Sequence, residues 1–203
     1  MVAVCVFCSS ASGIDPVYLR LAADVGVQIA ARGHSLVSGG GRVSMMGEVA
    51  RAVRARGGRT LGVIPRALTG LEVADDDADE LVVTADMRQR KARMDHAADA
   101  FVVLPGGLGT LEELLEIWVS RSLGMHAKPV VACDPTGYFA GLRAAVEGMV
   151  DAGFVRAAAA AEPDWTTTPD AALDAVEAGC AAAVPDASGR QHRFAEEALE
   201  AEP

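Results

Sequence analysis

Short apolar runs alternate with longer segments of helical periodicity along most of the chain. The apolar runs predict strands at residues 2–8, 35–38, 60–64, 81–84, 100–104 and 129–133. The periodic segments predict helices at about 15–32, 44–57, 86–98, 110–123, 139–152 and 169–183. Continuous apolar strands are typical of sheets covered on both faces. The alternation therefore predicts an α/β fold: a single-domain, doubly wound, Rossmann-like parallel sheet with helices on both faces.

The remaining segments lack a face that could pack in a core. Residues 66–80 show no clear period and contain four aspartates, Asp75, Asp76, Asp77 and Asp79, so they predict a surface loop. Residues 186–203 are polar and charged, and we expect a frayed or disordered tail there. The predicted domain therefore spans residues 1–185.

The strand at 100–104 leads into a glycine-rich turn, Pro105-Gly106-Gly107-Leu108-Gly109-Thr110, and then into an acidic helix. Glycines let backbone N–H groups close on a ligand, and Thr110 is a favourable N-cap. The N-terminus of a helix favours an anion. Ligands of doubly wound sheets bind outside the carboxyl ends of the strands, so this turn predicts a phosphate site there.

Two further turns fall at the same edge of the predicted sheet. The hydroxyl-rich turn around Ser9 and Ser10 follows the first strand. The run from Gly39 to Gly41, with Ser44 three positions on, nearly matches the dinucleotide-binding G-x-G-x-x-G. It follows the second strand, however, and Thr60–Gly62 stand where an acidic residue would hold the ribose. The glycine turns fit either tight packing or an anion site.

The helix at 86–98 gathers four cations in an acidic protein. At about 100° per residue, Arg90 shares its face with Met87, Met94 and Ala97, while Arg88 points away. A buried charge needs a partner because unpaired burial is costly. We therefore expect an anion near Arg90, whereas a solvated helix face suits the other arginines.

Spacing along the helix alone leaves the role of Glu113 ambiguous. The helix after Thr110 turns Leu111, Leu114, Leu115 and Trp118 toward the core, and Glu112, Glu113 and Glu116 lie off that face. Glutamates in an early helical turn complement the helix dipole. Spacing therefore favours this role for Glu113 over a catalytic one.

Composition and cysteine usage exclude several classes of function. The net charge of −10 argues against general binding to nucleic acid or anionic membranes. The N-terminus lacks the pattern of a signal peptide and no run is long enough to span a bilayer, so we expect a cytoplasmic protein. Cys5 and Cys8 fall on opposite faces of one strand, which favours buried, reduced thiols over a metal or redox site.

Two ordered motifs resemble a known family. Residues 105–113 fit P-G-G-x-G-T-x-x-E, and residues 87–94 fit M-x-x-R-K-x-x-M. Together they are similar to the Lonely Guy family of cytokinin riboside 5′-monophosphate phosphoribohydrolases, whose members were long labelled possible lysine decarboxylases. The similarity covers residues 2 to about 154. The sequence departs from the common family pattern at Ser9 and at residues 42–47.

The resemblance implies hydrolysis of the N-glycosidic bond of an adenosine-type 5′-monophosphate, without a cofactor or metal, by a homodimer. Arg90 and Glu113 would be the catalytic pair, which reverses the interpretation of Glu113 from spacing. The resemblance implies that substrate and phosphate are bound by Ser10, Gly40, Gly41, Glu72, Lys91, Gly106, Gly107, Gly109, Thr110 and Glu112.

Two alternatives remain at this stage. A non-catalytic carrier of a nucleotide or of molybdenum cofactor could use the same fold. A pyridoxal-dependent lysine decarboxylase would need a Schiff-base lysine, and the chain contains only Lys91 and Lys128. Lys91 belongs to the arginine motif and Lys128 directly precedes a predicted strand, which disfavours the decarboxylase.

Overall fold

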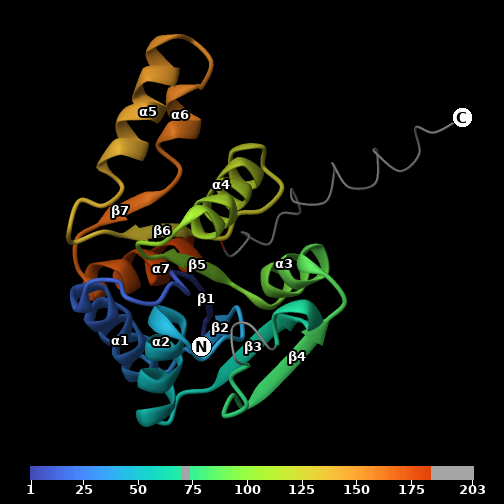
Figure 1. Cartoon of the computed structure of the whole chain (residues 1–203). Coiled ribbons are helices and arrows are strands. Elements are labelled where there is room, and N and C mark those ends of the chain that lie inside the picture. The colour runs from blue at the N-terminus through green and yellow to red at the C-terminus, as the bar shows by residue number, and fades with distance from the viewer. Residues whose placement is uncertain (70–73, 184–203) are drawn as a thin grey trace, which may run out of the picture.

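Seven parallel strands form one sheet in the computed structural model, which describes residues 1–69 and 74–183 (Figure 1). The strands are β1 (Ala3–Phe7), β2 (Ser35–Ser38), β3 (Thr60–Pro65), β4 (Glu80–Thr84), β5 (Ala100–Val103), β6 (Val130–Cys133) and β7 (Asp164–Thr166). Their order across the sheet is β4-β3-β2-β1-β5-β6-β7. The direction of winding therefore reverses between β1 and β5, and doubly wound sheets bind ligands at such a point.

Helices cover both faces of the sheet, as predicted. They are α1 (Pro16–Ala31), α2 (Ser44–Ala55), α3 (Met87–Ala97), α4 (Leu108–Ser122), α5 (Ala140–Asp151), α6 (Ala157–Ala160) and α7 (Pro169–Ala183), with a 3-10 turn η1 (Arg66–Leu68). One core contains α1, α2 and α7, and the other contains α3 and α4. Successive side chains of a strand point to opposite faces, so Cys5 and Cys8 enter different cores, as their spacing predicted.

Beyond β6, the sequence pattern missed the strand β7 and the short helix α6, although it predicted α5. β7 has only three residues and pairs with β6 through Trp165, opposite Ala132. Trp165 packs edge-on against Trp118 of α4, with 6.2 Å between the ring centroids. Beyond this edge, α5 and α6 extend away from the sheet as a helical pair (Figure 1). A strand this short, beginning at Asp164, lacks the apolar run from which the other strands were predicted.

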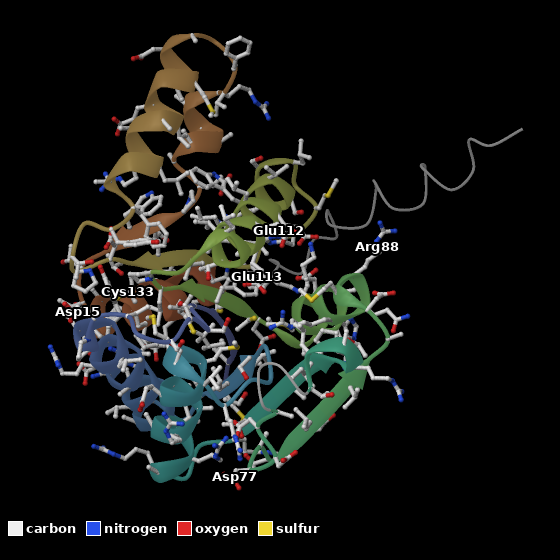
Figure 2. The ribbon with its side chains drawn as sticks, viewed as in Figure 1. Asp15, Asp77, Arg88, Glu112, Glu113 and Cys133 are labelled. Atoms are coloured by element: carbon white, nitrogen blue, oxygen red, sulfur yellow. The ribbon has the colours of Figure 1, made fainter. Side chains whose placement is uncertain are left out.

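The prediction that residues 66–80 form a surface loop is wrong in part. Asp75 is buried, and both of its carboxylate oxygens accept from Arg54 of α2, at 2.8 and 3.1 Å. Asp76, Asp77 and Asp79 are exposed as expected, and Figure 2 shows Asp77 at the margin of the molecule. Composition predicted an exposed run, but only the fold selects which aspartate turns inward.

Two earlier expectations lie outside the described residues: the position of Glu72 and the frayed tail at 186–203. Within residues 1–69 and 74–183, no helix is long and apolar enough to cross a membrane.

Close packing of α1 on α2 yields a test of the fold. A Cβ added to Gly26 would lie 2.5 Å from the backbone oxygen of Val49. Gly26→Ala should therefore lower the free energy of unfolding by about 1–3 kcal/mol through overpacking. Gly148→Ala is the matched control, because its added Cβ on α5 meets nothing within 4 Å. It should raise stability by up to about 1 kcal/mol through helix propensity. Urea titration measures the free energy of unfolding of both variants. Equal changes in the two variants would contradict the close packing of α1 on α2.

Candidate active site

A cavity of about 240 Å³ opens where the winding of the sheet reverses. Its polar wall comes from the turns after β1 and β2 and from α3 and α4, and includes Ser9, Ser10, Gly39, Arg90, Gly107, Gly109, Thr110, Glu112 and Glu113. Its apolar wall includes Phe7, Met46, Leu68, Met87 and Met94. Segments far apart in the sequence thus meet at the edge where the sequence predicted a ligand.

The glycine turn after β5 forms the N-terminus of α4. The helix begins at Leu108 with Gly107 as its N-cap, so the prediction that Thr110 caps it is wrong. The first helical bond here runs from Leu111 N–H to the Gly107 carbonyl at 3.1 Å. The N–H groups of the residues between them precede the helical ladder and can serve an anion.

Contacts on either side of Gly106 shape this turn. A Cβ on Gly106 would lie 2.1 Å from Oγ1 of Thr110, so only glycine fits without rearrangement. The Tyr138 hydroxyl donates to the Gly106 carbonyl at 2.7 Å. Gly107, Gly109 and the buried Thr110 line the cavity. The turn therefore places the backbone of Gly107 and Gly109 at the wall of the cavity.

Arg90 is buried, as its place on the apolar face of α3 predicted, with 7% of its side chain exposed. Its Nε donates to the Val63 carbonyl of β3 and its Nη2 donates to the Gly39 carbonyl, both at 3.1 Å. A Cβ on Gly39 would lie 1.9 Å from Nη2, so the absence of a side chain there makes room for the guanidinium. Two carbonyls from different elements thus fix the plane of the guanidinium.

Glu113 is the anion that Arg90 faces. Its Oε1 lies 3.9 Å from Arg90 Nη1, and 11% of its side chain is exposed. Figure 2 shows Glu113 on α4 toward the middle of the molecule, whereas Arg88 points away from it. Helical spacing identified only the face of α4 that packs on the sheet, because it contains no information about α3 alongside. The approach of Arg90 favours a role for Glu113 in the site over a role as a simple complement to the helix dipole.

Lys91 pairs with α4 as well. Its Nζ lies 2.5 Å from Glu112 and 2.7 Å from Glu116. The Lys91 ammonium donates to the carboxylates of Glu112 and Glu116, and these hydrogen bonds, that to Glu112 first, raise the pKa of Lys91. A Schiff-base lysine must lose its proton, and this environment opposes that loss. The other lysine, Lys128, is bound to Asp95 at 2.9 Å, so neither lysine fits pyridoxal chemistry.

The other residues of the predicted site lie around the cavity in different ways. Ser10 lines it. Gly40 and Gly41 face the loop after β3 instead: the Gly40 carbonyl accepts from Asp75 N–H at 2.9 Å, and Gly41 pairs with Ala74. Gly39 was not predicted as a site residue, although it begins the same glycine run. Nothing in the sequence connected it with Arg90.

The thiol of Cys8 also lines the cavity. Burial, with a further contribution from the charge of Glu113, raises its pKa well above the usual range. The thiolate is the nucleophilic form of cysteine, so Cys8 acts as an apolar wall. Within the described residues, no group of three or more His, Cys, Asp or Glu side chains is arranged to hold a metal.

Comparison with known proteins extends these observations. The family model described as "Possible lysine decarboxylase" matches residues 46–176. A Mycobacterium tuberculosis protein named cytokinin riboside 5′-monophosphate phosphoribohydrolase is 55% identical over 152 residues, which are 75% of this chain and 81% of that protein. An Arabidopsis thaliana protein of that name is 45% identical, over 75% of this chain and 70% of its own length.

Solved structures confirm the fold. A molybdenum cofactor carrier protein from Chlamydomonas reinhardtii superposes with a TM-score of 0.66 at 23% identity, over 88% of this chain and 98% of its own. A molybdenum cofactor binding protein from Rippkaea orientalis gives 0.65 at 20% identity, over 87% and 95%. At this identity the likeness concerns the fold alone. The family match and the identity to curated relatives show that the chain belongs to the Lonely Guy family, whose curated members are named cytokinin riboside 5′-monophosphate phosphoribohydrolases.

Proposed function

We propose that this protein hydrolyses the N-glycosidic bond of cytokinin riboside 5′-monophosphates, releasing the free base and ribose 5-phosphate. Arg90 and Glu113 are the catalytic residues of the proposal. The substrate and its phosphate are held by the N-terminus of α4, with Gly106, Gly107, Gly109 and Thr110, and by Ser10, Glu72, Lys91 and Glu112. Gly40 and Gly41 contribute indirectly, because they face the loop after β3 and support the turn. The relatives' names supply the substrate class, and the cavity supplies groups suited to it.

One observation carries the proposal: the anion site and the carboxylate stand on the same helix. Thr110 and Glu113 are three positions apart on α4 and both line the cavity. Three residues of an α-helix rise about 4.5 Å, a span of the same order as that between the phosphorus and the anomeric carbon of ribose 5-phosphate. A phosphate bound at the N-terminus of α4 would bring the anomeric carbon near Glu113.

The chemistry follows from that placement. As the glycosidic bond breaks, the base leaves with the bonding electron pair and the ribose ring gains oxocarbenium character. The Glu113 carboxylate stabilises this positive charge and takes a proton from the attacking water, whose oxygen bonds to the anomeric carbon. The leaving base takes up a proton from solvent and Glu113 returns its own to solvent, so the sum is nucleotide plus water giving base plus ribose 5-phosphate. Arg90 offsets the charge of Glu113 and fixes its direction.

Binding energy from the phosphate serves to orient the ribose. The apolar wall with Met46, Leu68, Met87 and Met94 suits the faces and substituents of a purine. Methionine side chains adapt to ligand shape. A carrier would need the anion site and the apolar wall, but it would have no use for a buried carboxylate facing the ribose. We therefore favour hydrolysis over the carrier alternative.

We further propose that the protein is a homodimer that works in the cytoplasm. The exposed side of α4 presents an apolar stripe of Leu108, Leu115, Val119 and Leu123, with exposed fractions of 43% or more. Leu115 was predicted to face the core, so this side is more apolar than the spacing indicated. A two-fold axis would pair the stripe with its own copy. Free cysteines suit a reducing compartment.

The first test is product analysis. Purified protein incubated with isopentenyladenosine 5′-monophosphate, and separately with AMP, should release the free base and ribose 5-phosphate from the first substrate. Chromatography with mass detection measures both products. Binding of the nucleotide without any base release would favour the carrier instead.

Glu113→Gln should lower kcat by about 100-fold or more, because the amide can neither take the proton nor balance the developing charge. The KM for the nucleotide should change little, because the turn at Gly106–Thr110 is untouched. Glu147→Gln, at an exposed position of α5, is the control and should behave as the unaltered protein. Near-normal base release by Glu113→Gln would remove Glu113 from the mechanism.

Val119→Glu should convert the dimer to a monomer, because the interface would bury a carboxylate of each copy without a partner. Light scattering coupled to gel filtration, over a range of protein concentrations, measures the mass. Ala55→Glu places the same charge at an exposed position of α2 and should leave the dimer intact. A monomeric unaltered protein, or a dimeric Val119→Glu, would contradict the proposed interface.

A further inference from the structure

Arg54 and Asp75 form a buried ion pair that lies outside the cavity. The pair adjoins the Gly39–Gly41 turn, which forms part of the cavity wall through Gly39. Arg54 is in the last turn of α2, and its side chain is 19% exposed, whereas that of Asp75 is 4% exposed. Both carboxylate oxygens are engaged, at 2.8 and 3.1 Å. Bidentate pairing fixes orientation as well as distance. The pair therefore holds the loop after β3 firmly against α2.

Asp75 also contacts the glycine turn after β2. Its backbone N–H donates to the Gly40 carbonyl at 2.9 Å, and Ala74 pairs with Gly41. Gly40 has a positive φ of 74°, and an added Cβ would lie 3.0 Å from the Val63 nitrogen. The turn is thus enclosed between β3 and the segment that Asp75 anchors.

Arg90 depends on the position of this turn. The Gly39 carbonyl, one residue before Gly40, accepts from Arg90 Nη2 at 3.1 Å. The same guanidinium places Nη1 at 3.9 Å from Glu113. A displacement of the turn would therefore move one of the two carbonyls that fix Arg90, and with it the geometry of the catalytic pair.

We propose that Arg54 and Asp75 are positioning residues for the hydrolysis: their ion pair holds the Gly39–Gly41 turn so that Arg90 faces Glu113. This inference rests on the proposed function for its kinetic consequences and on the contacts above for its structural ones. Neither residue lines the cavity as described, so both act through the backbone of the turn. The anion site on α4 belongs to the other half of the sheet and is not part of this chain of contacts.

Asp79 offers a matched control at the other end of the same loop. Its carboxylate accepts from Thr60 N–H at 2.8 Å and from the Thr60 hydroxyl at 3.1 Å. Hydrogen bonds from Thr60 lower the pKa of Asp79. Thr60 begins β3, at the end of the strand away from the cavity. Loss of either carboxylate should weaken the fold, but only the loss of Asp75 should disturb Arg90.

The kinetic test compares Asp75→Asn with Asp79→Asn. Asp75→Asn should lower kcat by about tenfold, because small misplacements of a catalytic group are costly. Its KM, and inhibition by the product ribose 5-phosphate, should stay within about twofold, because the anion site is intact. Asp79→Asn should keep both constants. If Asp75→Asn fails to fold, Arg54→Lys keeps the charge, loses the bidentate geometry and replaces it in the test.

A second measurement reports on the environment of the Arg90 side chain and does not depend on catalysis. The Nε–H of Arg90 is buried and bonded to Val63, so it should give a slowly exchanging signal in a proton–nitrogen correlation NMR spectrum. Arg90→Lys identifies the signal by removing it. Asp75→Asn should shift the signal or speed its exchange with solvent, whereas Asp79→Asn should not.

The outcomes separate the two proposals. A fall in kcat together with an altered Arg90 signal, in Asp75→Asn alone, supports the positioning role. Equal losses of thermal stability in both variants, with unchanged kcat and an unchanged Arg90 signal, overturn it. If the unaltered protein releases no base, the proposed function fails, and the NMR comparison still decides whether the ion pair positions Arg90.

Discussion

The buried guanidinium of Arg90 is the constraint on which the site depends. A charge withdrawn from water must be paired and hydrogen-bonded, or its burial is prohibitive. Here the partners come from three places: a carbonyl of β3, a carbonyl of the turn after β2, and the Glu113 carboxylate of α4. Satisfying one side chain therefore fixes the relative position of elements on both sides of the point where the sheet reverses its winding.

Because the protein has a large negative net charge, the pairing of its acidic side chains near the cavity affects how an anion can approach. A protein with a charge of −10 repels anions at long range. An anionic substrate must therefore be attracted by short-range groups, and the first turn of α4 supplies backbone N–H groups that pH does not titrate. Because Glu113 is offset by Arg90 and Glu112 by Lys91, the carboxylates beside that turn oppose an incoming phosphate less than isolated charges would.

Sequence reasoning predicted the architecture well because the strands here are continuous apolar runs and the helices are periodic. It missed β7, whose three residues have no such signal. It also predicted that Arg90 turns inward, since a helix has one apolar face and Arg90 lies on it. It could not place Glu113 from spacing, because the partner of Glu113 belongs to another helix. The family motif predicted a catalytic role for Glu113, and the approach of Arg90 supports the role that we propose.

Buried polar groups in loops were the least predictable feature. Asp75 stands among four similar aspartates, and its burial follows from the position of Arg54 on a separate helix. Gly39 begins a run of three glycines, and it must be glycine because Arg90 approaches it, whereas Gly40 has a positive φ. Such residues are selected by tertiary contacts that leave no period in the sequence.

A fold shared with cofactor carriers does not by itself select a chemistry, because function resides in the side chains placed on the fold. In this chain, α4 contains both the proposed anion site and the Glu113 carboxylate, at a separation fixed by helical geometry. A rigid helix keeps that separation constant during the reaction. Arg90 then fixes the direction of the carboxylate, and the glycine turn fixes Arg90. Under the positioning role that we propose, the precision of the site therefore also depends on contacts of Gly40 and Asp75, which do not line the cavity.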